Sequence, residues 1–242
     1  MRTLTLLMAL MLGLLTVPGE ENSSLAKKNG YVINLDRAEK LEKMTYSSLF
    51  SKAGIIVLED TDESLLGKVD KLEVCDNNLY VLEKGRGLFL FNKQGKFIKM
   101  IGRKGKGPGE YIDPDDISID RENKKIYVLD SQTQNVLKYS GNGTFESSFK
   151  LENKGTRSTF IQPFKNAFYT NLYTFDKSGK RFLLSKVDVT NGKRISFQFE
   201  ASQYNKGWNE LFSTNQHTFI SGPTGNPKFM QIFMDTIFEI TP

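Results

Sequence analysis

Three carboxylates stand just ahead of two apolar runs, and of all the side chains in this sequence they are the best suited to hold a metal ion. Asp70 precedes the run Leu72–Val74, and Asp115 and Asp116 precede a second run that begins at Ile117. If both runs are strands that start at one central channel, the carboxylate oxygens offer the ligands that Ca²⁺ prefers. The surrounding sequence does not match the D-x-[DN]-x-[DN]-G calcium loop. Asp also caps turns, so a structural role is the alternative.

A second candidate site is the basic, glycine-rich segment between these runs. Arg103, Lys104 and Lys106 could attract an anionic ligand, with Glu110 beside them, and Tyr111 could stack on a sugar or a peptide. The segment is not a phosphate-binding P-loop, which requires G-x-x-x-x-G-K-[ST] between a strand and a helix. The alternative is structural: its glycines and proline shape a crossing between two sheets, and Glu110 and Tyr111 anchor it.

Residue types that commonly carry catalysis are scarce. His217 is the one histidine and Cys75 the one cysteine, so Cys/His zinc chemistry is excluded. Nothing around His217 suggests a Ser-His-Asp triad, and Cys75 ends an apolar run, as an inert buried thiol does. We therefore expect a protein that is not an enzyme, with no catalytic residues and no cofactor.

The candidate site residues lie in or between two copies of a four-strand pattern, so these strands must determine their positions. The first copy has apolar runs at Leu72–Val74, Leu79–Leu82, Leu88–Phe91 and Phe97–Ile101, with Asn-, Asp- and Gly-rich breaks. The pattern recurs 47 or 48 residues later, so that Tyr127 matches Tyr80 and Gly143 matches Gly95. Such breaks favour tight hairpin turns, and a repeat of about 40–50 residues with four short strands is typical of a β-propeller blade.

The repeat weakens toward the end of the chain. Ala167–Tyr173, Phe182–Val187 and Ile195–Phe199 predict a third blade, and a fourth begins near Thr218 and stops before its outermost strand. The predicted fold is therefore all-β, a β-propeller of four-stranded antiparallel blades with about three blades and part of a fourth.

The N-terminal region predicts export. Arg2 is followed by an apolar run from Leu4 to Val17, which is shorter than the ~20 residues of a membrane-spanning helix and ends at a small-residue cleavage site. We divide the chain into a signal peptide (1–19), a lead (20–45) and an incomplete propeller domain (46–242). We also expect a short helix within Asp36–Phe50 and an isolated strand at Ile55–Leu58.

Charge and composition narrow the class of partner. The net charge is +5, with 33 basic and 28 acidic residues, which solubility alone explains. We expect no nucleic-acid partner, no transmembrane segment in the mature chain and a periplasmic, extracellular or cell-surface location.

The segments Ile55–Val74, Phe91–Tyr111, Ile126–Asp130 and Asp235–Ile240 resemble the exported six-bladed β-propeller proteins of Bacteroidetes-type bacteria, relatives of the NHL-repeat propellers. The GKGPGEY stretch is the most specific part of the likeness. The resemblance implies a non-enzymatic binding or scaffold module. Because those proteins are typically longer and many are lipoproteins, it also suggests that this chain is a truncated member.

Three functional hypotheses follow. The first is an exported propeller that binds a protein or a glycan, of unknown identity, through loops between blades. The second is a metal-dependent hydrolase or lyase of the lactonase type that uses Asp70, Asp115 or their neighbours. The third is a non-functional fragment of a longer propeller.

Overall fold

The computed structural model describes residues 43, 45–174, 180–204, 218–221, 225–231, 234 and 236–241. The chain divides into two compact units. One is Met1–Ala53 with Thr236–Phe238, and the other is Gly54–Asp235 with Glu239–Pro242. The signal segment 1–19 and nearly all of the lead 20–45 lie outside the described residues. Of the helix expected within Asp36–Phe50, the described part contains one turn, α2 (Tyr46–Leu49).

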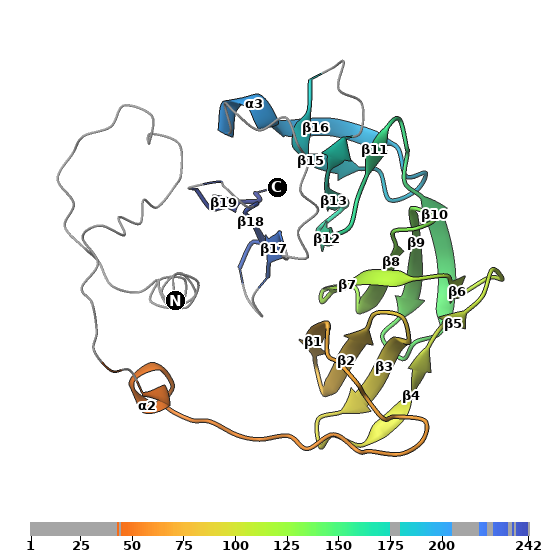
Figure 1. Cartoon of the computed structure of the whole chain (residues 1–242), viewed down its shortest axis with the longest axis vertical. Coiled ribbons are helices and arrows are strands. Elements are labelled where there is room, and N and C mark those ends of the chain that lie inside the picture. Colours follow the sequence, from red (N-terminus) through yellow and green to blue (C-terminus); the bar gives the residue numbers. More distant parts are fainter. Residues whose placement is uncertain are drawn as a thin grey trace. The chain divides into compact units, whose positions relative to one another are not determined.

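Four antiparallel sheets follow one another along the chain, in the arrangement of a β-propeller, and we number them as blades I to IV (Figure 1). Blade I consists of β1 (Lys71–Cys75), β2 (Asn78–Glu83), β3 (Gly87–Asn92) and β4 (Phe97–Ile101). Blade II consists of β7 (Pro114–Asp120), β8 (Lys125–Asp130), β9 (Asn135–Ser140) and β10 (Phe145–Lys150).

The last two blades are less regular. Blade III consists of β12 (Ile161–Phe164), β13 (Ala167–Asn171), β15 (Phe182–Val187) and β16 (Arg194–Glu200), followed by the helical turn α3 (Ala201–Tyr204). Blade IV consists of β17 (Phe219–Ile220), β18 (Lys228–Phe229) and β19 (Phe238–Glu239). Two short pairs complete the described strands: β5 (Arg103–Lys104) with β6 (Glu110–Tyr111), and β11 (Thr156–Arg157) with β14 (Tyr173–Thr174).

The predicted all-β propeller, with three blades and part of a fourth, is confirmed, although one strand was not predicted and one predicted strand is wrong. The innermost strand of blade III, β12, was not predicted; it contains Pro163, and proline normally argues against a strand. Proline is tolerated here because β12 is the edge of its sheet. Ile55–Leu58 was expected to be a strand, but it forms none.

Blades I and II pack through one apolar layer. Residues that pair across strands share a face, so the register places Tyr80 and Leu90 on one side of blade I, and Leu79 and Phe91 on the other. The first of these faces meets blade II. The layer between them contains Cys75, Tyr80, Leu82, Leu88, Leu90 and Ile101 from blade I and Ile117, Ile119, Ile126, Val128, Leu137 and Tyr139 from blade II.

The same construction joins blade II to blade III. Tyr127, Leu129 and Val136 lie on the second face of blade II and pack against Ile161 and Phe168 of blade III. The rings of Tyr127 and Phe168 meet edge-on, with centroids 4.9 Å apart. Both faces of blade II are thus apolar and buried, which explains why its central strands do not alternate between polar and apolar residues.

The outer hairpins turn at glycines whose backbone has a positive φ. A residue with a side chain would be strained in this left-handed conformation. Gly95 (φ 84°), Gly143 (φ 78°) and Gly192 (φ 73°) precede β4, β10 and β16. A Cβ atom on Gly192 would lie 1.9 Å from the backbone oxygen of Lys150, so the glycine also lets two blades approach closely.

Replacing Gly192 with alanine separates these two effects. Gly85 also has positive φ (86°), but a Cβ there would meet nothing within 4 Å. We expect Gly85→Ala to lower the free energy of unfolding by about 1–2 kcal/mol through backbone strain alone. Gly192→Ala should cost roughly 1–3 kcal/mol more, because the backbone of Lys150 must move. Urea unfolding of both variants measures the difference, and equal losses would contradict the close approach.

Candidate functional site

Asp116, one of the three expected metal ligands, instead joins three blades. Its side chain is fully buried on β7, the innermost strand of blade II. One carboxylate oxygen accepts a hydrogen bond from the Lys71 Nζ on β1 at 2.8 Å, and the other accepts from the backbone N–H of Ile161 on β12 at 2.9 Å. Both carboxylate oxygens are therefore held by groups of the neighbouring blades.

Lys71, Asp116 and Ile161 occupy the same place on three successive innermost strands. Each lies directly opposite a residue of the second strand in its blade, and successive positions are 45 residues apart. The ammonium of Lys71 is itself mostly buried and lies 3.7 Å from Glu73. A buried carboxylate without its cation is strongly unfavourable, so this contact restricts how the blades can pack.

The other two expected metal ligands bind different partners. Asp70 accepts from the backbone N–H of Lys84 at 2.9 Å and lies 2.6 Å from the Lys68 ammonium. Burial opposes ionisation of this carboxyl, but those two hydrogen bonds and the positive charges of Lys68 and Lys84 together outweigh it and lower the pKa of Asp70. Asp115 accepts a hydrogen bond from the Ser131 hydroxyl, and its pKa is raised by burial, with Lys84 at 3.5 Å offsetting part of the effect.

The structure therefore does not bring Asp70, Asp115 and Asp116 together as a metal-type cluster. Across the described residues, no group of three His, Cys, Asp or Glu side chains could hold a metal ion. His217, the remaining imidazole candidate, lies outside those residues.

The basic segment from Arg103 to Tyr111 closes on itself. Its two ends, β5 and β6, pair in parallel, with Arg103 opposite Glu110. Glu110 accepts from the Arg103 Nε at 2.6 Å and from the backbone N–H of Gly107 at 2.9 Å. The hydrogen bond from Gly107 lowers the pKa of Glu110 the most, and the bond from Arg103 lowers it further. Glu110 therefore fixes the shape of the loop rather than facing a ligand.

Tyr111 is a packing residue. Its ring is 1 % exposed and belongs to the layer between blades I and II. Its hydroxyl donates to the Ile101 carbonyl at 3.0 Å and accepts from the Leu88 N–H at 3.2 Å. Burial also raises the pKa of this hydroxyl. The ring is therefore not available to stack on a sugar or a peptide.

Three cations remain at the surface of this loop. The Arg103 side chain is 81 % exposed although it pairs with Glu110, and Lys104 and Lys106 are exposed as well. Gly105, Gly107 and Gly109 allow the tight path, and at Gly105 any Cβ would collide with the Glu110 carboxylate. The loop is thus an internally braced turn that presents positive charge to solvent.

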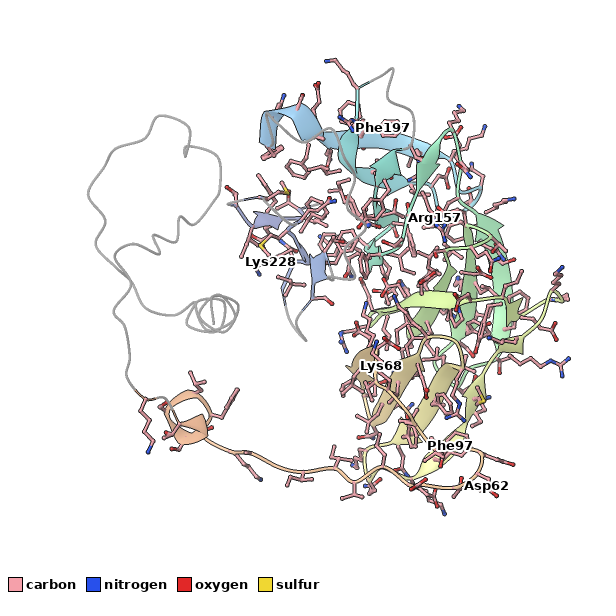
Figure 2. The ribbon with its side chains drawn as sticks, in the orientation of Figure 1. Asp62, Lys68, Phe97, Arg157, Phe197 and Lys228 are labelled. Carbon is pink, nitrogen blue, oxygen red and sulfur yellow. The ribbon has the colours of Figure 1, made fainter. Side chains whose placement is uncertain are left out.

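A polar network that the sequence did not suggest links blade II to the segment that leads into blade III. Ser131 is buried, donates to Asp115 and accepts from the Arg157 guanidinium at 2.9 Å. The Gln134 amide exchanges hydrogen bonds with the backbone of Ser158 in both directions, each 2.8 Å long. Figure 2 labels Arg157 among the packed side chains of the blades. A local search of the sequence cannot find these contacts, because the partners are 24 or 26 residues apart.

Arg194 makes a second buried network, which links two strands of blade III to Glu152, just after β10. Its guanidinium donates to the Ser185 and Thr170 hydroxyls at 2.6 and 2.9 Å and to the Glu152 carbonyl at 3.1 Å. Burial lowers the pKa of Arg194 to about 10, with Glu152 opposing the shift. These donors are committed to the protein, so the arginine holds its own fold together and not a ligand.

Comparison with known proteins places the chain in a family. The family described as "Domain of unknown function (DUF4934)" matches residues 30–242. The chain belongs to this family. A search of the curated proteins gives no match. Within the described residues, no helix is long and apolar enough to cross a membrane.

One solved structure agrees with the fold. A candidate exported protein of Bacteroides fragilis NCTC 9343 is similar, with a TM-score of 0.61 and 23% identity over 77% of this chain and 51% of that one. The chain therefore spans about half the length of that protein. The glutaminyl cyclase of Myxococcus xanthus is less similar, with a TM-score of 0.44 and 12% identity over 69% of each chain. A DUF4221 member of Bacteroides vulgatus has a TM-score of 0.38 and 10% identity over 50% of this chain and 38% of that one.

The anchoring role of Tyr111 is testable with a matched pair of substitutions. Tyr111→Phe removes a hydroxyl that serves two buried backbone groups, and we expect it to cost about 1–3 kcal/mol of unfolding free energy. The Tyr173 hydroxyl is buried with no hydrogen-bond partner, so Tyr173→Phe should be neutral or stabilising. Thermal and urea unfolding compare the two, and a neutral Tyr111→Phe would refute the anchor.

Proposed function

We propose that this chain is an exported, non-enzymatic β-propeller module that binds an acidic partner, a protein or a glycan. The observation that carries the proposal is the braced loop from Arg103 to Tyr111, which presents Arg103, Lys104 and Lys106 to solvent. A rigid loop loses little conformational entropy on binding, so its charges are available at low cost. The loop connects blades I and II, and inter-blade loops are a common place for propeller ligands.

The arrangement of the carboxylates supports binding rather than catalysis. Asp70, Asp115 and Asp116 each accept hydrogen bonds from protein donors, and Asp116 is fully buried. A general acid or base must reach a substrate proton, and a metal ligand must have a free oxygen. We infer that these residues serve the packing of the blades.

Export is part of the same proposal. The N-terminal composition has the order of a secretory signal, and the similar Bacteroides fragilis protein is named as a candidate exported protein. We also propose that the domain belongs to the six-bladed, NHL-like propellers, on the strength of the sequence resemblance. A periplasmic or surface location would give the basic loop access to acidic polysaccharides and acidic protein segments.

Binding to an acidic probe tests the function. Polygalacturonate and a poly-glutamate peptide serve as immobilised probes, and Lys104→Gln/Lys106→Gln is the test variant. Each exposed ion pair contributes ~0.2–1 kcal/mol, so we expect the double variant to bind about tenfold more weakly. Binding should also weaken as salt is raised from 0.05 to 0.3 M.

The control carries the same change of charge elsewhere. Lys93 and Lys96 are exposed on the outer hairpin of blade I, and Lys93→Gln/Lys96→Gln should bind both probes like the unchanged protein. Equal losses in the two double variants would mean that net charge alone is responsible. That result, or no binding to either probe at low salt, would contradict the proposal.

A further inference from the structure

Arg157 carries a positive charge that has no ionic partner in the described part of the chain. Arg86, Arg103 and Arg121 each form an ion pair with a glutamate. Arg157, which lies on β11 and is labelled in Figure 2, donates from Nη2 to the Ser131 hydroxyl at 2.9 Å, and its Nε and Nη1 have no partner among the described residues. A guanidinium stays charged and has only donors to offer, so these nitrogens require acceptor atoms from water or from a ligand.

The protein holds this guanidinium through one of its nitrogens. Ser131 is buried and donates its single proton to the Asp115 carboxylate, so its oxygen is left to accept from Arg157. Asp115 in turn lies 3.5 Å from the Lys84 ammonium, which offsets the negative charge of the carboxylate. Arg157 is therefore positioned by a short chain of polar contacts, while no ion pair neutralises its own charge.

Tyr173 brings an unused hydroxyl to the same face of the strand pair. β11 and β14 are antiparallel, and Tyr173 lies directly opposite Arg157. Side chains of directly opposed residues project from one face, with Cβ atoms about 5 Å apart. Tyr173 is 5% exposed, and its hydroxyl has no hydrogen-bond partner among the described residues. Because buried polar groups nearly always have a partner, this hydroxyl also points to a water molecule or a ligand.

Unused hydrogen-bonding groups are concentrated around these two residues. In the part of the chain that the structure describes, the buried side-chain atoms without a partner belong to Thr133, Thr156, Tyr173, Thr218 and Gln231. Thr156 and Tyr173 lie on β11 and β14, and Thr133 follows Ser131 by two residues in the same turn. Most of these atoms therefore belong to the turn or the strand pair that positions Arg157. A polar molecule bound here would replace more missing hydrogen bonds than at any other described place.

The unused groups select the chemistry of the ligand. Arg157 offers only donors, and the Tyr173 hydroxyl can donate as well, so the matching group has acceptor oxygens and a negative charge. A carboxylate fits because its two oxygens match the parallel N–H groups of a guanidinium. A phosphate dianion is less suited, since the Asp115 carboxylate, which is linked to Arg157 through Ser131, repels a second negative charge.

We propose that the β11–β14 pair binds a carboxylate group. The Arg157 guanidinium donates to both carboxylate oxygens, and the Tyr173 hydroxyl donates to one of them. Sugar acids and the C-termini of peptides both present such a group. The two strands form a sheet of their own, separate from the loop that runs from Arg103 to Tyr111, so this site does not depend on the function proposed for that loop.

Nuclear magnetic resonance of the protein with isotope-labelled arginine tests the proposal. The Nε–H signal of Arg157 is identified by its absence from the spectrum of Arg157→Lys. It should shift on titration with galacturonate, with N-acetylalanine or with both, and the stronger of the two identifies the source of the carboxylate. Galactose and N-acetylalanine amide, which lack the carboxylate, should leave the signal in place. Inorganic phosphate should bind at least about tenfold more weakly than the better carboxylate.

Two variants separate a ligand-binding role from a structural one. Arg157→Gln keeps a donor for Ser131 but removes the charge, and calorimetric titration should show at least about tenfold weaker carboxylate binding. Tyr173→Phe should weaken binding about three- to tenfold. In the ligand-free protein its urea unfolding should be unchanged or shifted to higher urea, because the lost hydroxyl has no partner there. Weaker binding without loss of stability is expected of a hydroxyl that serves a ligand.

The controls change charge elsewhere. Arg86→Gln removes the charge of an arginine whose side chain is 40% exposed, and Lys104→Gln/Lys106→Gln alters the basic loop. Both should bind the small carboxylates like the unchanged protein, so failure of the loop's function and failure of this site are distinguishable. An Arg157 signal that shifts with neither carboxylate, phosphate binding of equal strength, normal binding by Arg157→Gln or Tyr173→Phe, or an equal loss in a control would overturn the proposal.

Discussion

The packing of the blades depends on one buried carboxylate. Asp116 has no exposed surface, and its two oxygens are held by the Lys71 ammonium of blade I and the Ile161 N–H of blade III. A buried charge is tolerated only where partners and hydrogen bonds are in place. Many apolar faces could slide over one another, but few offsets between blades leave this carboxylate satisfied. The contact therefore selects one packing among several of similar apolar area.

The remaining contacts between blades are consistent with that packing. Tyr80 of blade I donates to the Gly141 carbonyl in the outer turn of blade II at 2.8 Å, and Tyr139 of blade II donates to Gly109 of the braced loop at 3.1 Å. Glu110 and Tyr111 fix the two ends of that loop by polar contacts and by burial. The loop can present Lys104 and Lys106 only because residues with structural roles hold its path.

The sequence predicted the blades well because their signals are local. Turn residues such as Asn77 and Gly95 separate short apolar runs, and the match of Tyr80 with Tyr127 revealed the repeat. It could not predict the roles of Asp116 or Ser131, because Lys71 lies 45 residues from Asp116 in another blade and Arg157 lies 26 residues from Ser131 on β11. It could not tell that the Tyr111 ring would be buried rather than exposed. Pro163 concealed β12 because tolerance of proline depends on which strand forms the edge of the sheet.

A double-mutant cycle between Lys71 and Asp116 tests the central claim most directly. Unfolding free energies of Lys71→Met, Asp116→Asn and the combined variant are measured by urea denaturation. If the carboxylate holds the blades through this pair, the two changes are coupled by about 1–3 kcal/mol, and the combined variant is less destabilised than the sum of the single ones. Additive losses, within ~0.5 kcal/mol, would contradict the account, since the packing would then rest on the apolar faces alone.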